Sequence, residues 1–216
     1  MKGARGSGIG AWGAGVALAA CLASVSALNK PAAAQQNSPG NLVFVLDPAE
    51  TKVNFTLGAT MHTVHGTFQP LRGRVEYTAA TGGAHGEIVV DAPSGASGDA
   101  GRDKKMHAEI LETDKFPIIT FRPDRVEGKV AAEGESTVQV HGIFSVHGAD
   151  HELNVPATVK VEGKNWTATV KFSVPYVQWG MKNPSVFLLR VSKTVDVEIT
   201  ATGTVTPGPP SDGFRG

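Results

Sequence analysis

Four of the seven histidines in the chain form two closely spaced pairs, His62-x-x-His65 and His147-x-x-x-His151. Imidazole groups at such spacings can bind a metal ion if the backbone turns so that the two rings converge. On a β-strand this needs a bend, and neither pair is accompanied by a nearby cysteine or an H-E-x-x-H motif. Single histidines are often simply surface or hydrogen-bonded residues. We therefore predict no metal site and no cofactor.

The sequence lacks the motifs that mark the common catalytic sites. It contains no G-x-S-x-G nucleophile elbow and no phosphate-binding P-loop. Its carboxylates are spread along segments of alternating polarity, where solvated charge is the ordinary explanation. The sequence therefore predicts no catalytic residues and a protein that is not an enzyme.

Four cationic or titratable side chains suit a different kind of chemistry. His62, His65, Arg102 and Lys105 can contact the polar head of a bound amphiphile, because apolar pockets use a few placed polar groups to orient a ligand. The alternative is that each is an exposed residue without a ligand role, as most polar loop residues are. The sequence leaves both interpretations open.

The composition is that of one ordinary globular domain. Hydrophobic residues make up 41% of the chain and charged residues 19%, which is enough apolar mass for a sizeable core. The formal net charge is zero, but three of the 20 basic residues, Lys2, Arg5 and Lys30, precede the first acidic residue. Without these three, 17 basic residues face 20 acidic ones. Such a domain lacks a basic stripe, so we expect no nucleic-acid partner.

Residues 1–34 have the three parts of an export signal. A basic start is followed by an apolar run over 11–28 and then by small residues, and Ala32-x-Ala34 fits the cleavage rule. Cleavage there makes Gln35 the first residue of the exported protein, with a short flexible leader over 35–40. The sequence therefore predicts a periplasmic protein of a bacterium.

Cys21, the only cysteine, offers a second route of export. Leu18-Ala19-Ala20-Cys21 resembles the lipobox at which bacterial lipoproteins are cut and acylated. Residues 22–28 stay apolar, however, where a lipoprotein normally becomes polar, so we favour cleavage after Ala34. The exported protein then has no cysteine, and so neither a disulfide nor thiol chemistry.

Apolar and polar residues alternate almost throughout the span from residue 41 to residue 205. This pattern is typical of antiparallel strands with one face in solvent, and the connections are too short for parallel crossovers. The third expected strand should bend or break at Pro70. Residues 206–216 are rich in Pro and Gly and are predicted to be a disordered tail. The expected strands cover 42–47, 51–60, 64–78, 84–92, 117–128, 135–147, 151–162, 166–176 and 190–205.

Only residues 99–111 suggest a helix. Asp99 can cap its start, Met106 and Ile110 can belong to an apolar stripe, and Pro117 prevents a continuation. Such a short amphipathic element is either a lid over one end of a barrel or a plain surface crossover.

Eight or nine long antiparallel strands with one dry face must close on themselves or stack as two sheets. The expected strands are longer than those typical of a sandwich. We therefore predict an all-β fold, a closed antiparallel up-and-down β-barrel of about eight strands with one short helix. A barrel of this size is either filled by its own side chains or holds one small ligand.

Five motifs follow one another in the predicted barrel, at residues 47–55 (DPAETKVNF), 65–68 (HGTF), 101–106 (GRDKKM), 116–121 (FPIITF) and 138–148 (VQVHGIFSVHG). In this order they resemble the YceI-like family, over nearly the whole of Leu42 to Val205. The resemblance implies a lipocalin-like antiparallel barrel, usually periplasmic, whose apolar tunnel holds a long-chain isoprenoid or another amphiphile.

One stretch departs from the family pattern. Many members carry an arginine-x-aspartate-aromatic-glycine stretch near the end, where this chain has Pro175-Tyr176-Val177-Gln178-Trp179-Gly180. Because both charges are missing, any head-group contact that they make in other members is lost at this place.

The apolar halves of the alternating strands supply the expected lining of such a tunnel. A register slip of one residue would turn each of these side chains to the outside. We predict ligand-binding roles for twelve residues, namely Val53, Phe55, Leu57, Phe68, Ile119, Phe121, Val140, Phe144, Trp166, Val170, Phe172 and Trp179.

The sequence thus favours a protein that binds or carries a long-chain lipid, such as a polyisoprenoid or a quinone, inside a barrel. The alternative is a non-enzymatic structural or interaction barrel that is filled by its own side chains. The identity of the lipid stays open, and so does self-association as a homodimer.

Overall fold

The computed structural model describes residues 40–209. The predicted export signal, most of the predicted leader and the end of the predicted tail lie outside the described residues. One helical segment is present in the described part, α1 (Ala100–Lys105), which continues as a π-helical turn over Met106–Ile110. No helix within residues 40–209 has both the length and the apolar composition needed to cross a bilayer. The strands are β1 (Leu42–Leu46), β2 (Lys52–Gly58), β3 (Thr63–Thr78), β4 (Gly83–Ala96), β5 (Ile118–Glu127), β6 (Gly134–Val146), β7 (Ala149–Glu162), β8 (Asn165–Val174) and β9 (Val195–Pro207).

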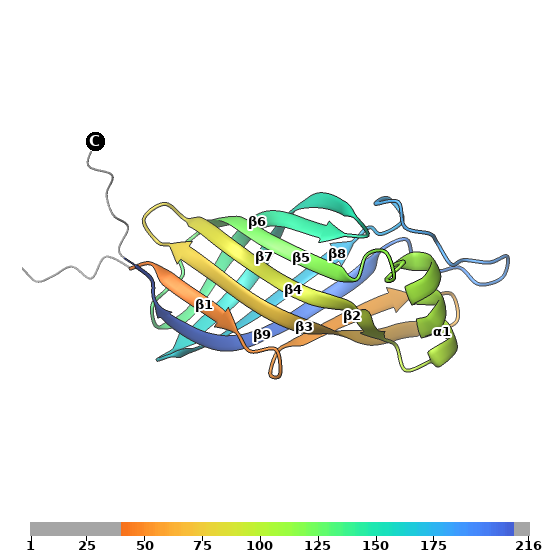
Figure 1. The fold of residues 1–216 in the computed structure, drawn as a ribbon, viewed down its shortest axis with the longest axis horizontal. Helices are drawn as coiled ribbons and strands as arrows, with labels where there is room; N and C mark the ends of the chain where they lie inside the picture. The colour runs from red at the N-terminus through yellow and green to blue at the C-terminus, as the bar shows by residue number, and fades with distance from the viewer. Residues whose placement is uncertain (1–39, 210–216) are drawn as a thin grey trace, which may run out of the picture. The chain divides into compact units, whose positions relative to one another are not determined.

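The nine strands form one closed antiparallel sheet, as the sequence predicted (Figure 1). From β2 to β9 each strand pairs with the next along the chain, and β9 closes the ring by pairing with β1 and β2. Because β1 and β2 also both pair with β3, they occupy a single position in the barrel, one after the other. The result is an eight-position barrel, a size at which the interior can hold one small ligand.

A tight turn separates β1 from β2. The Asp47 carboxylate accepts a hydrogen bond from the Ala49 amide at 2.9 Å, and the Asp47 carbonyl accepts one from the Thr51 amide at 3.1 Å. The Thr51 hydroxyl accepts a hydrogen bond from the Thr202 amide of β9 at 3.1 Å. These bonds satisfy backbone groups that lose their strand partners at the interruption. The turn therefore stays attached to β9, and the barrel wall remains continuous.

Prolines mark irregular places in this wall. The pairing of β3 with β4 shifts between Pro70 and Arg72, which is the predicted bend. The pairing of β5 with β6 shifts between Pro123 and Arg125. Proline has no amide hydrogen for the ladder, and bulges bend a strand and increase its twist. These positions therefore help a long sheet to curve into a barrel.

The strand ends near the C-terminus differ from the expected ones. β8 ends at Val174 instead of residue 176, since Pro175 cannot donate an amide hydrogen. The predicted strand over 190–205 is wrong in its first residues, because β9 begins only at Val195 and the apolar residues before it belong to a loop. β9 then continues to Pro207, and its last two residues pair with β1 although the sequence assigned them to the tail.

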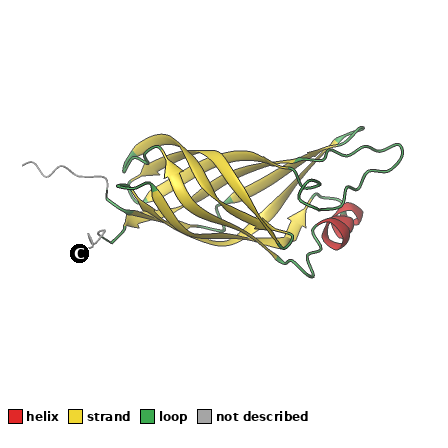
Figure 2. Cartoon of the chain, turned by 90° about the horizontal axis from the view of Figure 1, so that it is seen from above, coloured by secondary structure: helices red, strands yellow, loops and turns green. Residues whose placement is uncertain are grey.

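The helical segment lies at one end of the barrel, where a lid would be placed (Figures 1 and 2). Asp99 caps α1 as expected, and its carboxylate accepts a hydrogen bond from the Arg102 amide at 2.8 Å. This backbone hydrogen bond lowers the pKa of Asp99. Farther on, His107 Nε2 lies 2.8 Å from the Gly95 carbonyl oxygen, which ties the π-helical turn to β4.

The opposite end of the barrel is packed shut by its own side chains. Tyr77, Ala84 and Val161 are no more than 2% exposed. Trp166 packs edge-on against Phe44 with 5.4 Å between the ring centroids. Its indole N–H donates a hydrogen bond to the Thr204 carbonyl at 3.0 Å, which satisfies the one polar group of this buried side chain. The barrel interior is therefore closed at this end.

Candidate functional site

The barrel interior holds two apolar cavities in line along its length. The larger has a volume of about 510 Å³ and lies at the α1 end, where Met106 of the π-helical turn and Ile110 help to line it. The smaller has a volume of about 200 Å³ and extends towards the closed end, where Tyr77 and Trp166 line it. The volume of the larger cavity, even without the smaller one, lies within the size range of small-molecule sites in proteins.

A ring of apolar side chains lies between the two cavities and lines both. β6 and β8 contribute Phe144 and Phe172, whose ring centroids are 6.0 Å apart in an edge-on arrangement. The cavities on the two sides of this ring are both apolar. One hydrocarbon chain that passes between the side chains of the ring can therefore occupy both cavities. The six side chains of the ring are Val53, Val90, Ile119, Phe144, Phe172 and Ile199.

The structure places eleven of the twelve sequence-predicted ligand residues on the cavity walls. Val53, Ile119, Phe144 and Phe172 belong to the ring. The other seven divide between the two spaces. Phe55, Leu57 and Phe68 line the larger cavity, and the smaller one is lined by Phe121, Val140, Trp166 and Val170.

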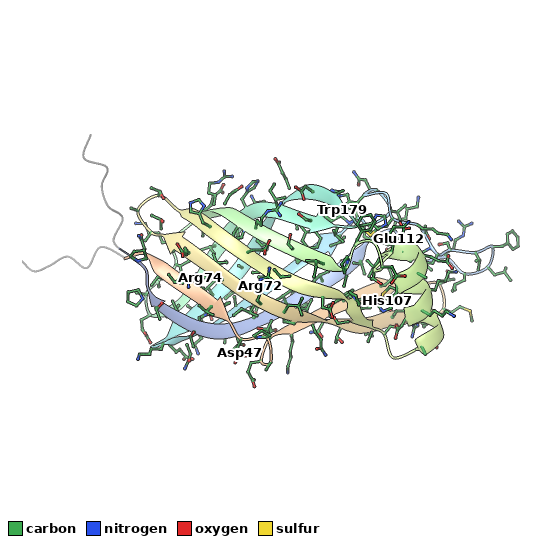
Figure 3. The ribbon with its side chains drawn as sticks, in the orientation of Figure 1. Asp47, Arg72, Arg74, His107, Glu112 and Trp179 are labelled. Carbon is green, nitrogen blue, oxygen red and sulfur yellow. The ribbon has the colours of Figure 1, made fainter. Side chains whose placement is uncertain are left out.

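Trp179 is the exception, because it lines neither cavity. Its position on the barrel is labelled in Figure 3. β7 pairs with β8 only from Ala157 onwards, so the first half of β7 has no partner on that side. There the Trp179 ring stacks on His151 with centroids 3.9 Å apart and 7° between the planes. Its centroid is also 5.9 Å from that of Phe144. Trp179 therefore packs behind Phe144, a member of the ring of six side chains, and covers the gap between β7 and β8.

Three of the four proposed head-group residues reach the larger cavity. His62, Arg102 and Lys105 line it at the α1 end. His65 does not, because its side chain lies on the outer face of β3, where its ring nitrogen is 3.1 Å from the Thr56 hydroxyl. His62 and His65 are thus on different faces of the wall and do not converge.

The Arg102 side chain is held in place by a small network. Its Nε donates a hydrogen bond to the Ser97 hydroxyl at 2.7 Å. The carboxylate of Asp103 in turn accepts hydrogen bonds from the Ser97 amide, at 2.8 Å, and from the Ser97 hydroxyl. The guanidinium keeps further donors for a ligand, since arginine carries five N–H groups and this network uses few of them. Arg102 is therefore the best-positioned cation at the cavity entrance.

The second histidine pair is also divided. His147 lies in a two-residue turn between β6 and β7 with a φ of 52°, and its Nε2 is 2.9 Å from the Glu112 carboxylate. Lys115 and then His147 hydrogen-bond to Glu112 and lower the pKa of that carboxyl. His151 lies on β7, beyond the turn, against Trp179. Within residues 40–209 no three His, Cys, Asp or Glu side chains are grouped so that they could hold a metal ion.

Sequence reasoning missed the cavity residues that come from the segment between β8 and β9. Tyr176 is 6% exposed, its hydroxyl donates to the Ser192 carbonyl at 2.7 Å, and burial raises its pKa. Four further residues of the segment line the larger cavity, namely Met181, Pro184, Leu189 and Val191. The apolar run Val186 to Leu189 was the available signal, but the sequence prediction began a strand at residue 190 and gave this run no role.

Comparisons with known proteins agree with this architecture. The family model of the YceI-like domain matches residues 44–203. A UPF0312 protein of Pseudomonas putida (strain GB-1) is 29% identical over 153 residues, which cover 65% of this chain and 73% of the relative.

Two solved structures share the fold. BcnA of Burkholderia cenocepacia superposes with a TM-score of 0.61 at 17% identity, over 74% of this chain and 99% of BcnA. A polyisoprenoid binding domain from Saccharophagus degradans superposes with a TM-score of 0.58 at 15% identity, over 76% of this chain and 98% of that domain. At such identities the likeness establishes the shared fold.

Proposed function

The chain belongs to the YceI-like domain family, and we propose that it binds the hydrocarbon chain of a long amphiphile, of the polyisoprenoid or quinone type, inside its barrel and carries it. The observation that supports this most directly is the apolar cavity of about 510 Å³, which is followed in line by a second of about 200 Å³. A barrel filled by its own side chains would not leave such space. The Saccharophagus degradans structure with the same fold is a polyisoprenoid binding domain, and this supports the same class of ligand.

Hydrocarbon burial is a sufficient source of affinity for this role. Each buried methylene contributes about 0.8 kcal/mol, so a dozen contribute roughly 10 kcal/mol before the costs of association are subtracted. No covalent step is needed to hold such a ligand. The protein proposed here is therefore a binding protein without a catalytic site.

The polar residues at the entrance determine the orientation of the ligand in this proposal. The lipid tail extends from the larger cavity past Phe144 and Phe172 into the smaller cavity, towards the closed end of the barrel. Its head group stays beside Arg102, Lys105 and His62 at the α1 end. Arg102 and Lys105 bring two positive charges to the larger cavity and Asp99 brings one negative charge, which already accepts a hydrogen bond from the Arg102 amide. The excess of positive charge favours an anionic head, such as a phosphate or a carboxylate, because charge-assisted hydrogen bonds are the stronger ones.

Arg102→Gln should weaken binding of geranylgeranyl phosphate by about tenfold or more. A hydrogen bond to a charged group contributes about 1.5–3 kcal/mol, and about 1.4 kcal/mol corresponds to a factor of ten. Binding of geranylgeraniol, which has the same chain without the charge, should change little. Titration calorimetry with both probes measures the difference.

Lys104→Gln is the matched control, because Lys104 is exposed on α1 and does not line the cavity. It should bind both probes as the parent protein does. An equal loss of both probes in the Arg102 variant would mean that Arg102 only supports the loop through Ser97 and makes no contact with the head group.

We also propose that the protein acts in the periplasm after cleavage behind Ala34. The basic start, the apolar run and the Ala32-x-Ala34 site support this location. N-terminal sequencing of the protein isolated from the bacterial envelope should begin at Gln35. A product that begins at an acylated Cys21 would instead make the protein a lipoprotein.

A further inference from the structure

The most exposed apolar side chains of the described residues gather at the α1 end of the barrel. Met61 is 84% exposed in the turn between β2 and β3. Val186, Phe187 and Leu188 are 59%, 93% and 81% exposed in the loop between β8 and β9. The remaining exposed large hydrophobic residues in 40–209 are only 39–46% exposed. We call Val186, Phe187 and Leu188 the apolar tip.

The apolar tip is a tight turn that two backbone hydrogen bonds close. The Val186 amide donates to the Leu189 carbonyl at 2.9 Å, and the Leu189 amide donates to the Val186 carbonyl at 3.1 Å. The base of the turn is fixed by the Val191 amide, which donates to the Ser185 hydroxyl at 2.8 Å. Gly, Pro, Asn, Asp and Ser are the usual residues of such turns. A Phe-Leu pair at the summit breaks this local rule, and such violations tend to mark functional sites.

The apolar tip is continuous with the wall of the larger cavity. Leu189, which directly follows the tip, and Val191, two residues farther on, line that cavity. Ala59 forms a bridge with Val191, and the Thr60 amide donates to the Arg190 carbonyl at 2.9 Å, so the turn that carries Met61 lies beside the loop. The loop extends beyond the barrel at the same end as α1 (Figures 1 and 2).

The charge of the loop complements an anionic surface. Residues 181–194 contain Lys182, Arg190 and Lys193 and no acidic residue. Lys182 pairs with Glu109 at 2.5 Å. Arg190 and Lys193 are exposed and form no ion pair with any other residue of the described chain. Apolar side chains flanked by cations are the composition that favours binding at the interface of an anionic bilayer.

We propose that the apolar tip and Met61 dock the cavity entrance onto the surface of an anionic phospholipid bilayer. This rests on the proposed function, since docking lets a lipid pass between the bilayer and the cavity without crossing water. The side chains of Phe187 and Leu188 insert among the lipid head groups, while Arg190 and Lys193 contact the phosphates. The few side chains of the tip form a far smaller surface than the roughly 800 Å² per partner of a stable protein interface.

The test is sedimentation of the purified protein with vesicles of phosphatidylglycerol and phosphatidylethanolamine. Replacing the two tip residues together, Phe187→Ser and Leu188→Ser, should lower the vesicle partition coefficient about tenfold or more. The matched control is Leu71→Ser, which removes another exposed apolar side chain, 46% exposed on β3, and should sediment as the parent does. Equal sedimentation of parent, tip variant and control would overturn the proposal.

Charge gives a second, independent readout. Arg190→Glu with Lys193→Glu should weaken binding to the anionic vesicles, and so should raising the salt concentration, because the attraction is screened. Vesicles of phosphatidylcholine, which are neutral, should show little dependence on these two residues. A loss of the same size on both kinds of vesicle would contradict the proposed phosphate contacts.

Fluorescence of cis-parinaric acid added in solution separates docking from cavity binding. The tip variant should still bind this fatty acid like the parent, because neither replaced side chain lines a cavity. A parent that binds the fatty acid but not vesicles would overturn the docking proposal and favour a protein partner for the tip. A parent that binds vesicles but no fatty acid would instead contradict the proposed function.

Discussion

Phe144→Asp should abolish the lipid binding that we propose for the barrel. Phe144 belongs to the ring that lines both cavities, and its aromatic neighbours are Phe172 at 6.0 Å and Trp179 at 5.9 Å. The ring side chains offer a carboxylate at this place no basic partner, and the cross-strand neighbour His151 is stacked on Trp179. Its burial costs several kcal/mol or forces its protonation. The expected result is a loss of lipid, or of folding, in the variant.

Thr137→Asp is the control for this experiment, because Thr137 lies on the same strand, exposed on the outer face. A surface change of this kind usually alters stability by no more than about 0.5 kcal/mol. Circular dichroism separates loss of folding from loss of lipid. If a folded Phe144 variant retains as much lipid as the parent, Phe144 does not line the lipid site.

Ala168→Phe should remove the preference for long over short chains that the proposed binding mode predicts. Ala168 lines the smaller cavity, and its neighbours on β7 and β9 are Val159 and Ala201. A phenyl ring there occupies space that the end of a long chain would otherwise fill. At about 0.8 kcal/mol per methylene, excluding about four methylenes costs about 3 kcal/mol, more than a hundredfold in affinity.

Binding of fatty acids of about 12 and about 20 carbons measures this effect, because only the longer chain should gain from the second cavity. Overpacking is expected to cost the variant about 1–3 kcal/mol of stability, which urea unfolding monitors. Thr167→Phe adds the same ring on the exposed outer face of β8 and should leave the chain-length preference intact. An unchanged preference in the folded Ala168 variant would mean that the chain does not reach the smaller cavity.

The barrel was predictable from the sequence because one face of each strand is dry. Alternation at Val53, Phe55 and Leu57 fixes both the strand and the side that faces inwards. The same pattern-based prediction was wrong just before β9, where a strand was expected to begin at residue 190, directly after the short apolar run Val186 to Leu189. A short apolar run does not by itself specify a strand. Here the run forms a tight turn that carries Leu189 on the cavity side and Leu188 in solvent.

The candidate site was predictable only where it depends on alternation. Phe144 and Phe172 follow the period-two pattern, so their inward orientation was expected. The place of Trp179 depends instead on the missing pairing between β7 and β8. Pro156, which has no amide hydrogen, directly precedes Ala157, the first β7 residue that pairs with β8. Proline alone does not specify where a strand pair opens. The separation of His62 from His65 likewise follows from the register of β3 and its preceding turn.

Native mass spectrometry of the protein purified from the cells that produce it tests the central claim most directly. If the barrel carries a long-chain amphiphile, the parent should show a reproducible added mass that collisional activation releases as a lipid. Thr137→Asp should retain that mass, and Phe144→Asp should lack it. A parent that shows only the mass of the bare polypeptide under gentle conditions would contradict the account and favour a structural barrel without a ligand.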